Sequence, residues 1–363
     1  MGEEETLLAE ASAIGDWLAE RAIWHAERCT WIAAHREPGP HGGPFAFTLE
    51  SSVHSGTAGV AMFLARLARA TGERRHRRAA KGALAHALKH AWHEDRAKTL
   101  VAAQTGGAWR LGPYLGALGV AWAADEVALA LGEPSRGRAL RRSVLATRRR
   151  AHGWDLMQGS AGAAGLLARS EPDVAFSLAR EVARRAPEVE AAGFSHGLSG
   201  AAWALSLFPE TREAAREAFL REEALPRERE TWCHGAPGMG LARALAGEPS
   251  RALRAQAQAR LDWLLERPGE LFHLCCGVAG VAACLHAMDD ALGEPGALAR
   301  SRAVARWGME RYQAGEPWRG WPTGALVDAH PGLMQGVAGI GHWLLELAQP
   351  GRVPSALAPI PSA

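Results

Sequence analysis

Residues 197–208, Gly-Leu-Ser-Gly-Ala-Ala-Trp-Ala-Leu-Ser-Leu-Phe, join a short glycine turn to an apolar run. Within that run Ala201, Ala204, Leu205 and Phe208 follow the i, i+3, i+4, i+7 spacing of an amphipathic helix. Glycine at a helix start allows close approach of two backbones, and the first turn of the helix leaves N–H groups free. The stretch therefore predicts an apolar helix that is entered through a Gly-x-x-Gly turn.

The Gly-x-x-Gly pattern recurs along the chain, each time before a stretch rich in alanine and leucine. Its seven copies begin at Gly56, Gly116, Gly159, Gly197, Gly235, Gly277 and Gly336. Successive copies are 38 to 60 residues apart, and a spacing near the lower value suits two helices and two connections per repeat. The longer gaps leave room for insertions.

Polar amphipathic stretches lie between the copies, such as Arg212–Glu223 and Ser250–Leu265. They predict a charged outer helix for each apolar inner helix. Strand signals are scarce, because β-branched residues are few and no alternating run persists. The sequence therefore predicts a nearly all-α chain.

Seven equivalent helix starts face the same way if the repeats close into a ring. Closure also removes the polar capping repeats that an open solenoid needs. We expect an α/α-toroid, a double ring of about seven inner and seven outer helices, with an open solenoid as the alternative. We expect one domain over residues 1–363, with the repeats at about 50–345 and a Pro-rich, loop-like tail at 349–363.

Composition excludes several classes of protein. The chain has 363 residues with 41 Lys+Arg and 39 Asp+Glu, a net charge of +2 that argues against a nucleic-acid binder. Apolar residues make up 48% and charged residues 22%, as in globular proteins. No stretch approaches 18 uncharged apolar residues, so no membrane span is expected. The acidic, amphipathic N-terminus does not resemble a signal peptide, and we expect a cytoplasmic protein.

Cysteine and histidine occupy the same turn in three neighbouring repeats. His196 and Cys276 directly precede the first glycines of their copies, and Cys233 and Cys275 stand two positions before theirs. In a closed ring the three cysteines would form one compact group. Three ligands and one exchangeable position are typical of catalytic zinc, although unpaired cysteine also serves as a small buried apolar residue. An odd total of five cysteines does not indicate a disulfide framework.

Three motifs together resemble the lanthionine synthetase C-like cyclases. They are Gly-Phe-Ser-His-Gly-x-x-Gly at 193–200, Trp-Cys-His-Gly-Ala-Pro-Gly at 232–238 and Cys-Cys-Gly at 275–277. The resemblance runs from about Leu7 to the Val-Pro-Ser-Ala-Leu end at 353–357 and is strongest to the C-terminal cyclase domain of class II lanthipeptide synthetases. It implies a toroid with zinc at one end that adds peptide cysteines to dehydroalanine or dehydrobutyrine, closing thioether rings.

The resemblance also implies roles for individual residues. It makes Cys233, Cys275 and Cys276 the ligands of one zinc ion per chain. Many family members have Cys-His-Gly at the third motif, so His273 and His234 are competing candidates for the third ligand.

For catalysis, His196 matches the histidine of the family and Asp155 matches the aspartate that works beside it. Arg229 matches a basic position near the site. The substrate would be a dehydrated precursor peptide. Class II enzymes carry a dehydratase domain before the cyclase and this sequence does not, so we expect either a separate dehydratase or a domain excised from a longer enzyme. The alternative functions are a glutathione-adding thiol transferase and a non-catalytic zinc-binding docking protein.

Other conspicuous residues have structural interpretations. We expect His54 to line the cavity. Cys29 and Cys284 lie in helical patterns and are expected to be buried filler. The arginine runs Arg74–Arg78 and Arg148–Arg150 are expected to be solvated surface, with docking of an acidic leader peptide as the weaker alternative.

Overall fold

Each Gly-x-x-Gly turn begins a helix in the computed structural model, which describes residues 2–36, 43–105, 110–147, 153–227, 229–267, 270–312, 323 and 329–362. The first glycine is the N-cap residue in all seven cases. The helices that follow form an inner ring: α2 (Thr57–Thr71), α4 (Ala117–Leu131), α6 (Ser160–Leu167), α8 (Leu198–Ser206), α10 (Ala236–Leu245), α12 (Val278–Leu292) and α14 (Val337–Ala348). The repeat pattern is thereby confirmed.

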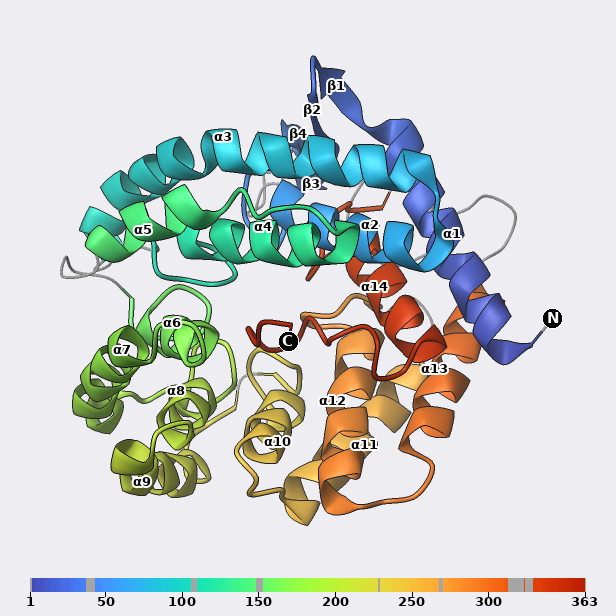
Figure 1. The fold of residues 1–363 in the computed structure, drawn as a ribbon. Coiled ribbons are helices and arrows are strands. Elements are labelled where there is room, and N and C mark those ends of the chain that lie inside the picture. The colour runs from blue at the N-terminus through green and yellow to red at the C-terminus, as the bar shows by residue number, and fades with distance from the viewer. Residues whose placement is uncertain are drawn as a thin grey trace.

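A second set of helices packs around the inner ring (Figure 1). These outer helices are α1 (Glu3–Arg21), α3 (Arg74–Thr105), α5 (Arg138–Ala146), α7 (Pro172–Arg185), α9 (Arg212–Glu222), α11 (Arg251–Leu265) and α13 (Ala297–Tyr312). A short 3-10 turn, η1 (Ala186–Glu188), follows α7, and a second one, η2 (Pro209–Thr211), precedes α9. Helix α14 packs on both α1 and α2, so the last repeat returns to the beginning of the chain. The fold is the expected all-α toroid.

A belt of backbone hydrogen bonds links the turns of successive repeats. Most of these bonds involve the backbone of the residue two positions before the first glycine of a turn, and their N···O distances are 2.7–3.4 Å. The donor and acceptor pairs are His54–Tyr114, Leu115–Met157, Met157–Ser195, Ser195–Cys233, Cys275–Met334 and Met334–His54. The last pair joins the seventh repeat to the first, which excludes the open solenoid. Within the described residues, no backbone hydrogen bond joins Cys233 to Cys275.

The second glycine of each turn is required by close backbone packing. A Cβ on Gly238 would lie 1.8 Å from the carbonyl oxygen of Trp232. A Cβ on the second glycine of any of the seven repeats would lie 1.7–2.1 Å from the corresponding carbonyl oxygen. No side chain can be accommodated at that distance, so the inner helices can reach this packing only with glycine there.

The C-terminal segment lies in the middle of the ring (Figure 1). The hydroxyl of Tyr114 donates to the carbonyl of Ala356 at 2.8 Å, and the indole Nε1 of Trp232 donates to that of Leu357 at 3.0 Å. Ala356 and Leu357 are buried. This Pro-rich segment has neither helix nor strand between 350 and 362, yet side chains from repeats on different sides of the ring hold it.

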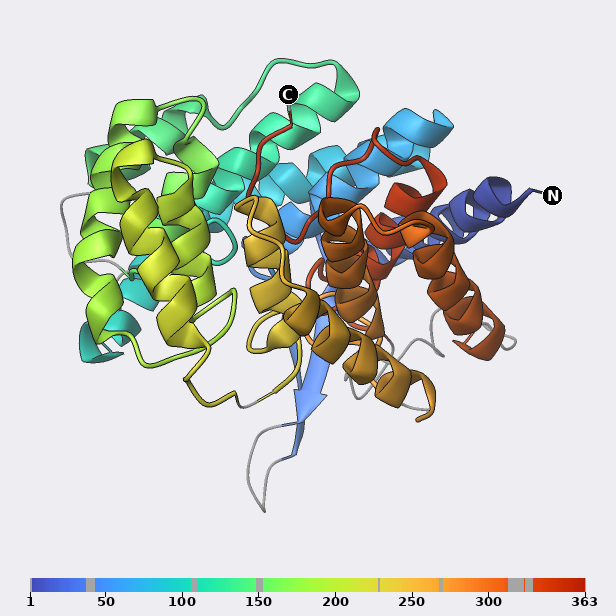
Figure 2. The same cartoon turned by 90° about the horizontal axis from the view of Figure 1, so that it is seen from below.

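Two antiparallel hairpins stand between α1 and α2, where the sequence analysis expected no strands. The strands are β1 (Ile23–His25), β2 (Arg28–Thr30), β3 (Ile32–Arg36) and β4 (Pro44–Thr48), paired β1–β2 and β3–β4. The β3–β4 hairpin projects beyond the helices (Figure 2). The prediction that Cys29 lies in a helix is therefore wrong. Cys29 is in β2, and its buried thiol donates to the carbonyl of Ala79 on α3 at 3.5 Å.

Further structural expectations from the sequence concern Cys284, two runs of arginines and membrane spans. Cys284 is fully buried in α12, as expected. The arginines of the run Arg74–Arg78 are exposed on α3, whereas His76 within it is buried. The run Arg148–Arg150 lies outside the described residues. In the described part of the chain, no helix has the length and apolar character needed to cross a membrane.

Candidate metal centre and active site

Three cysteine thiols converge where two neighbouring inner helices begin. Cys233 precedes α10, and Cys275 and Cys276 precede α12. The Sγ atom of Cys276 lies 3.5 Å from that of Cys233 and 3.4 Å from that of Cys275. All three ligand atoms lie within 4.8 Å of one another, and Cys233 and Cys275 are buried whereas Cys276 is half-buried. The structure therefore brings together the three cysteines that the sequence analysis expected to form one group.

The donor set matches a zinc ion with one open position. Sulfur atoms around tetrahedral zinc lie about 3.8 Å apart for a Zn–S bond of about 2.3 Å, and a disulfide would require about 2.05 Å. The cysteines are free thiols. Soft thiolate ligands favour zinc, and three protein ligands leave the fourth position to a substrate.

Neither competing histidine belongs to this group of donor atoms in the described residues. The Nδ1 atom of His273 instead accepts a hydrogen bond from the backbone N–H of Cys276 at 3.3 Å. His273 is buried, and burial together with the charge of His54 lowers its pKa to about 4. Its nitrogen thus supports the turn that carries Cys276.

Without a cation the three thiols share a single negative charge. Hydrogen bonds from Cys275 and Cys276 lower the pKa of Cys233 to about 2. The bond to the Cys233 thiolate in turn raises the pKa of Cys276 to about 12 and raises the pKa of Cys275 well above its ordinary value. The N-terminus of a helix stabilises a nearby thiolate. Because like charges repel, however, Cys275 and Cys276 keep their thiol protons. A bound divalent cation would remove that obstacle.

His196 and Asp155 form a hydrogen-bonded pair at the adjacent turns. His196 Nδ1 lies 2.7 Å from Asp155 Oδ2, and the side chains are 34% and 13% exposed. Asp155 is itself held, because its Oδ1 accepts the backbone N–H of Gln158 at 2.7 Å. With Nδ1 facing the carboxylate, Nε2 of His196 is left for another partner.

The charge around His196 favours its protonated form. Burial by itself lowers the pKa of His196, but the hydrogen bond and charge of Asp155, together with the charge of Cys233, raise it above its ordinary value. The effect of Cys233 also shows that the pair lies beside the cysteine group. An imidazolium next to a thiol site is an arrangement suited to donating a proton.

The remaining candidates surround this arrangement. The ring of His234 stacks on that of His196, with centroids 5.7 Å apart and planes at 29°, a contact that sequence reasoning did not identify although His234 follows a cysteine. Arg229 is exposed, and its charge lowers the pKa of Cys276, so it lies on the approach to the cysteines. His54 is buried in the belt, where its charge acts on His273.

Comparison with known proteins adds two findings. Residues 48–358 match the family model described as "Lanthionine synthetase C-like protein". The fold is similar to the solved structure of nisin cyclase, with a TM-score of 0.56 and 15% sequence identity. That match covers 83% of this chain and 89% of the nisin cyclase chain. The structural likeness concerns the fold.

Proposed function

The chain belongs to the lanthionine synthetase C-like family, and from this we propose that it is a cyclase that closes thioether rings in peptides. The reaction would add a cysteine thiolate of a peptide to a dehydroalanine or dehydrobutyrine of the same peptide, giving lanthionine or methyllanthionine. One observation carries the proposal. The three-cysteine group and the His196–Asp155 pair meet at one end of the ring, where inner helices begin.

Cys233, Cys275 and Cys276 would hold one zinc ion per chain. The chemistry that such an ion supplies is deprotonation of a peptide thiol, whose pKa of about 8.5 otherwise keeps it mostly protonated at neutral pH. The three protein thiolates carry a charge of −3 against the +2 of zinc, which leaves the centre formally at −1. Beside such a negative centre, a peptide sulfur would stay nucleophilic and His196 would favour its protonated form.

The chain's own residues would then complete the addition. The peptide sulfur forms a bond to the β-carbon of the dehydro residue, and the electron pair of the double bond moves toward the α-carbon and its carbonyl. His196, as imidazolium, would give its Nε2 proton to the α-carbon, and the proton that the thiol released to solvent would be replaced on His196 from solvent. Asp155 holds Nδ1, orients the ring and stabilises the charged form. The product is an isomer of the substrate.

The proposed reaction also has implications for the substrate, the partner enzyme and the compartment. The substrate would be a dehydrated precursor peptide, and a separate dehydratase would supply its dehydro residues. Free cysteine thiols suit a reducing compartment such as the cytoplasm. Residues 1–363 would act as one cyclase domain, with Arg229 at the approach to the thiols.

The test is incubation of the zinc-loaded protein with a dehydrated peptide, with and without glutathione. A cyclase consumes peptide thiols, measured by alkylation, while the mass of the unlabelled peptide stays unchanged. A glutathione transferase instead adds the mass of glutathione to the dehydro residues. A docking protein retains the peptide but leaves every thiol open to alkylation. Either of the last two outcomes would contradict the proposal.

A further inference from the structure

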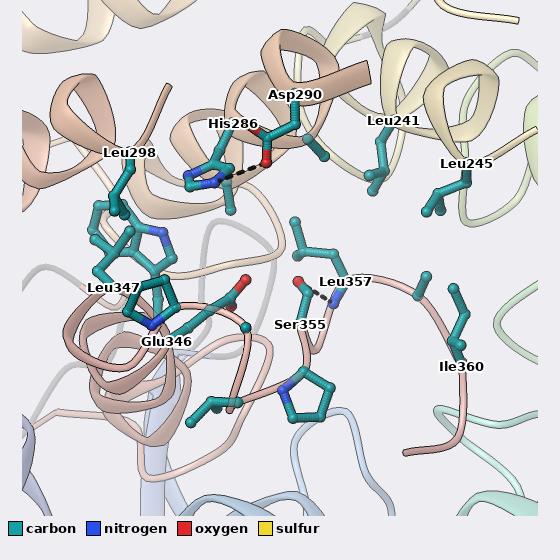
Figure 3. Close-up of a pocket in the computed structure, with 18 of the residues that line it drawn as sticks. Leu241, Leu245, His286, Asp290, Leu298, Glu346, Leu347, Ser355, Leu357 and Ile360 are labelled. Atoms are coloured by element: carbon teal, nitrogen blue, oxygen red, sulfur yellow. Dashed lines mark hydrogen bonds and ion pairs between the residues drawn. The ribbon is translucent and has the colours of Figure 1, made fainter. Parts of the chain in front are cut away.

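A pocket lies between α10, α12, α14 and the C-terminal segment (Figure 3). It has a volume of 470 Å³ and is enclosed by the C-terminal halves of α10, α12 and α14 and by the C-terminal segment. Gly277 begins α12 near the cysteines and Asp290 lies 13 residues later in the pocket wall, a distance of about 20 Å along a helix. The pocket is therefore separate from the candidate active site.

The walls of this pocket are mostly apolar, and its lining contains two acidic residues. Its leucines are Leu241, Leu245, Leu298, Leu347 and Leu357. The lining includes neither lysine nor arginine; its ionisable residues are His286, Asp290 and Glu346. His286 already has partners, because its Nε2 lies 3.2 Å from Asp290 Oδ2 and its Nδ1 lies 3.2 Å from Ser301 Oγ. Glu346 is the remaining ionisable group.

The carboxylate of Glu346 points into this pocket from α14 (Figure 3). No hydrogen bond or ion pair joins it to another residue in the described parts of the chain. Arg66 on α2 is close enough to affect its charge, but the guanidinium of Arg66 is bonded to Glu126 at 2.7 Å and to His342. The side chain of Glu346 is half-buried, and its burial raises its pKa to about 7 despite Arg66. A carboxylate in apolar surroundings is costly without a partner, and a cationic ligand would supply one.

We propose that this pocket binds a primary ammonium group carried on an unbranched alkyl chain. The ammonium ion would donate to Glu346, and the alkyl chain would lie along the leucines. An ammonium has only donors to offer, as an unpartnered carboxylate requires, and an alkyl stem buries well against apolar walls. A lysine side chain of a peptide and a free alkylamine share this chemistry. The proposal does not depend on the cyclase function.

Calorimetric titration with matched probes tests the proposal. Pentylamine should bind, and 1-pentanol, which has the same chain without the charge, should bind at least about tenfold more weakly. Glu346→Gln should reduce the affinity for pentylamine by about ten- to a hundredfold. The matched control is Glu266→Gln, because Glu266 is an exposed glutamate outside the pocket, and it should leave the affinity unchanged.

A second variant tests the place of binding. Ala287 lines the pocket, so Ala287→Phe should fill it and abolish pentylamine binding in a protein whose thermal unfolding shows that it is folded. A short blocked peptide with one lysine, compared with pentylamine, distinguishes a peptide side chain from a free amine as the source of the ammonium. Equal binding of pentanol, full binding by Glu346→Gln or no binding of either amine probe would overturn the proposal.

Discussion

The imidazole of His196 lies between a carboxylate and a group of thiols, and each neighbour favours its charged form. The hydrogen bond to Asp155 fixes the ring through Nδ1. The charge of Cys233 acts from the side where a peptide thiol would bind. A proton donor at this residue therefore has both the orientation and the protonation state that the proposed reaction needs.

Replacement of His196 separates proton donation from metal binding. His196→Asn should keep the zinc but slow ring closure by about 10²–10⁴-fold, because general acid catalysis is lost. Asp155→Asn should have the same effect to a smaller degree, because His196 remains present. Thiol alkylation over time on a defined dehydrated peptide measures the rates. Ring closure by His196→Asn at the wild-type rate would show that another group or water supplies the proton.

Removal of two cysteines tests the metal centre. The Cys275→Ala, Cys276→Ala double variant keeps one thiol of the group, and we expect elemental analysis to show zinc falling from one equivalent to almost none. Cys284→Ala is the matched control, because this buried thiol on α12 lies outside the group. Zinc retained at full occupancy in the double variant would contradict the assignment.

At the scale of the element, the second glycine of a turn limits what sequence an inner helix can have. Gly238→Ala places a Cβ 1.8 Å from the carbonyl of Trp232, so α10 has to move away from its turn. We expect a loss of at least about 2 kcal/mol in the free energy of unfolding, since overpacking of a rigid backbone has costs of this size. Denaturant titration measures the change. Gly153→Ala, whose nearest contact is 3.4 Å, is the control, and equal effects of the two would disprove the packing argument.

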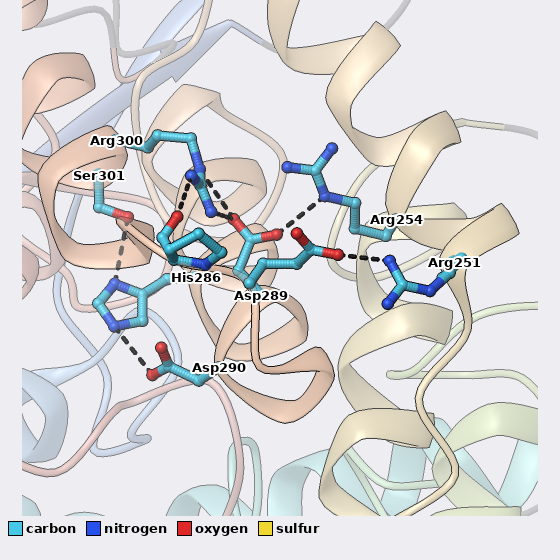
Figure 4. Close-up of polar contacts among 9 residues, drawn as sticks. Arg251, Arg254, His286, Asp289, Asp290, Arg300 and Ser301 are labelled. Atoms are coloured by element: carbon cyan, nitrogen blue, oxygen red, sulfur yellow. Dashed lines mark hydrogen bonds and ion pairs between the residues drawn. The ribbon is translucent and has the colours of Figure 1, made fainter.

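Asp289 joins the inner helix α12 to both of its outer neighbours (Figure 4). Its Oδ1 accepts from Nε of Arg254 on α11 at 2.8 Å, and its Oδ2 accepts from Nε of Arg300 on α13 at 3.0 Å. Burial on its own raises the pKa of Asp289, but the two arginines lower it below its ordinary value. The contribution to stability is therefore present above about pH 4, the usual range of an unfolded aspartate, and is lost as pH falls through the lower folded value.

Asp289→Asn should therefore reduce the free energy of unfolding at neutral pH by about 2–3 kcal/mol, because two guanidinium groups lose their counter-charge. The variant should also lose less stability than the wild type on acidification below about pH 4. Urea titrations at several pH values measure both effects. Glu294→Gln is the control, because Glu294 pairs with the exposed Arg251 and such pairs contribute about 0–1 kcal/mol. A neutral-pH loss for Asp289→Asn no larger than that of the control would contradict this interpretation.

Much of the helical framework could be predicted because its signal is local and repeated. The polar stretch expected at Arg212–Glu223 is α9 to within a residue, and that at Ser250–Leu265 is α11 with Ser250 as its N-cap. The cysteine group was predictable for the same reason, since equivalent turn positions meet when a ring closes.

The features that escaped prediction depend on distant partners. Cys29 lies in a strand of three residues, too short to show a period, and its place is set by packing on α3. The burial of Leu357 depends on Trp232, which is 125 residues away. In the sequence Glu346 is a single acidic residue in a mostly apolar helix. Its surroundings in the pocket become apparent only in the folded structure.

For the whole molecule, the C-terminal segment is expected to act as part of the core. Deletion of residues 354–363 leaves Tyr114 and Trp232 without their acceptors and uncovers the inner helices. Each buried donor without a partner costs about 1–3 kcal/mol, so the loss of both acceptors should reduce the free energy of unfolding by about 2–6 kcal/mol. Zinc content should be kept if the variant folds, because no residue of the segment belongs to the three-cysteine group. An unchanged unfolding midpoint would show that the segment is only a surface covering.

The same buried segment has a consequence for how the proposed peptide substrate would reach the thiols. Ala356 and Leu357 are buried in the middle of the ring, so the C-terminal segment fills part of the space between the inner helices. If the proposed peptide is the substrate, this segment would obstruct its passage from one face of the ring to the other, and the peptide would enter and leave by the same rim. Nothing then forces residues to be presented in sequence order. A peptide that already contains a closed ring, and is therefore too bulky to pass through the middle of the ring of helices, could still bring its next loop to the thiols.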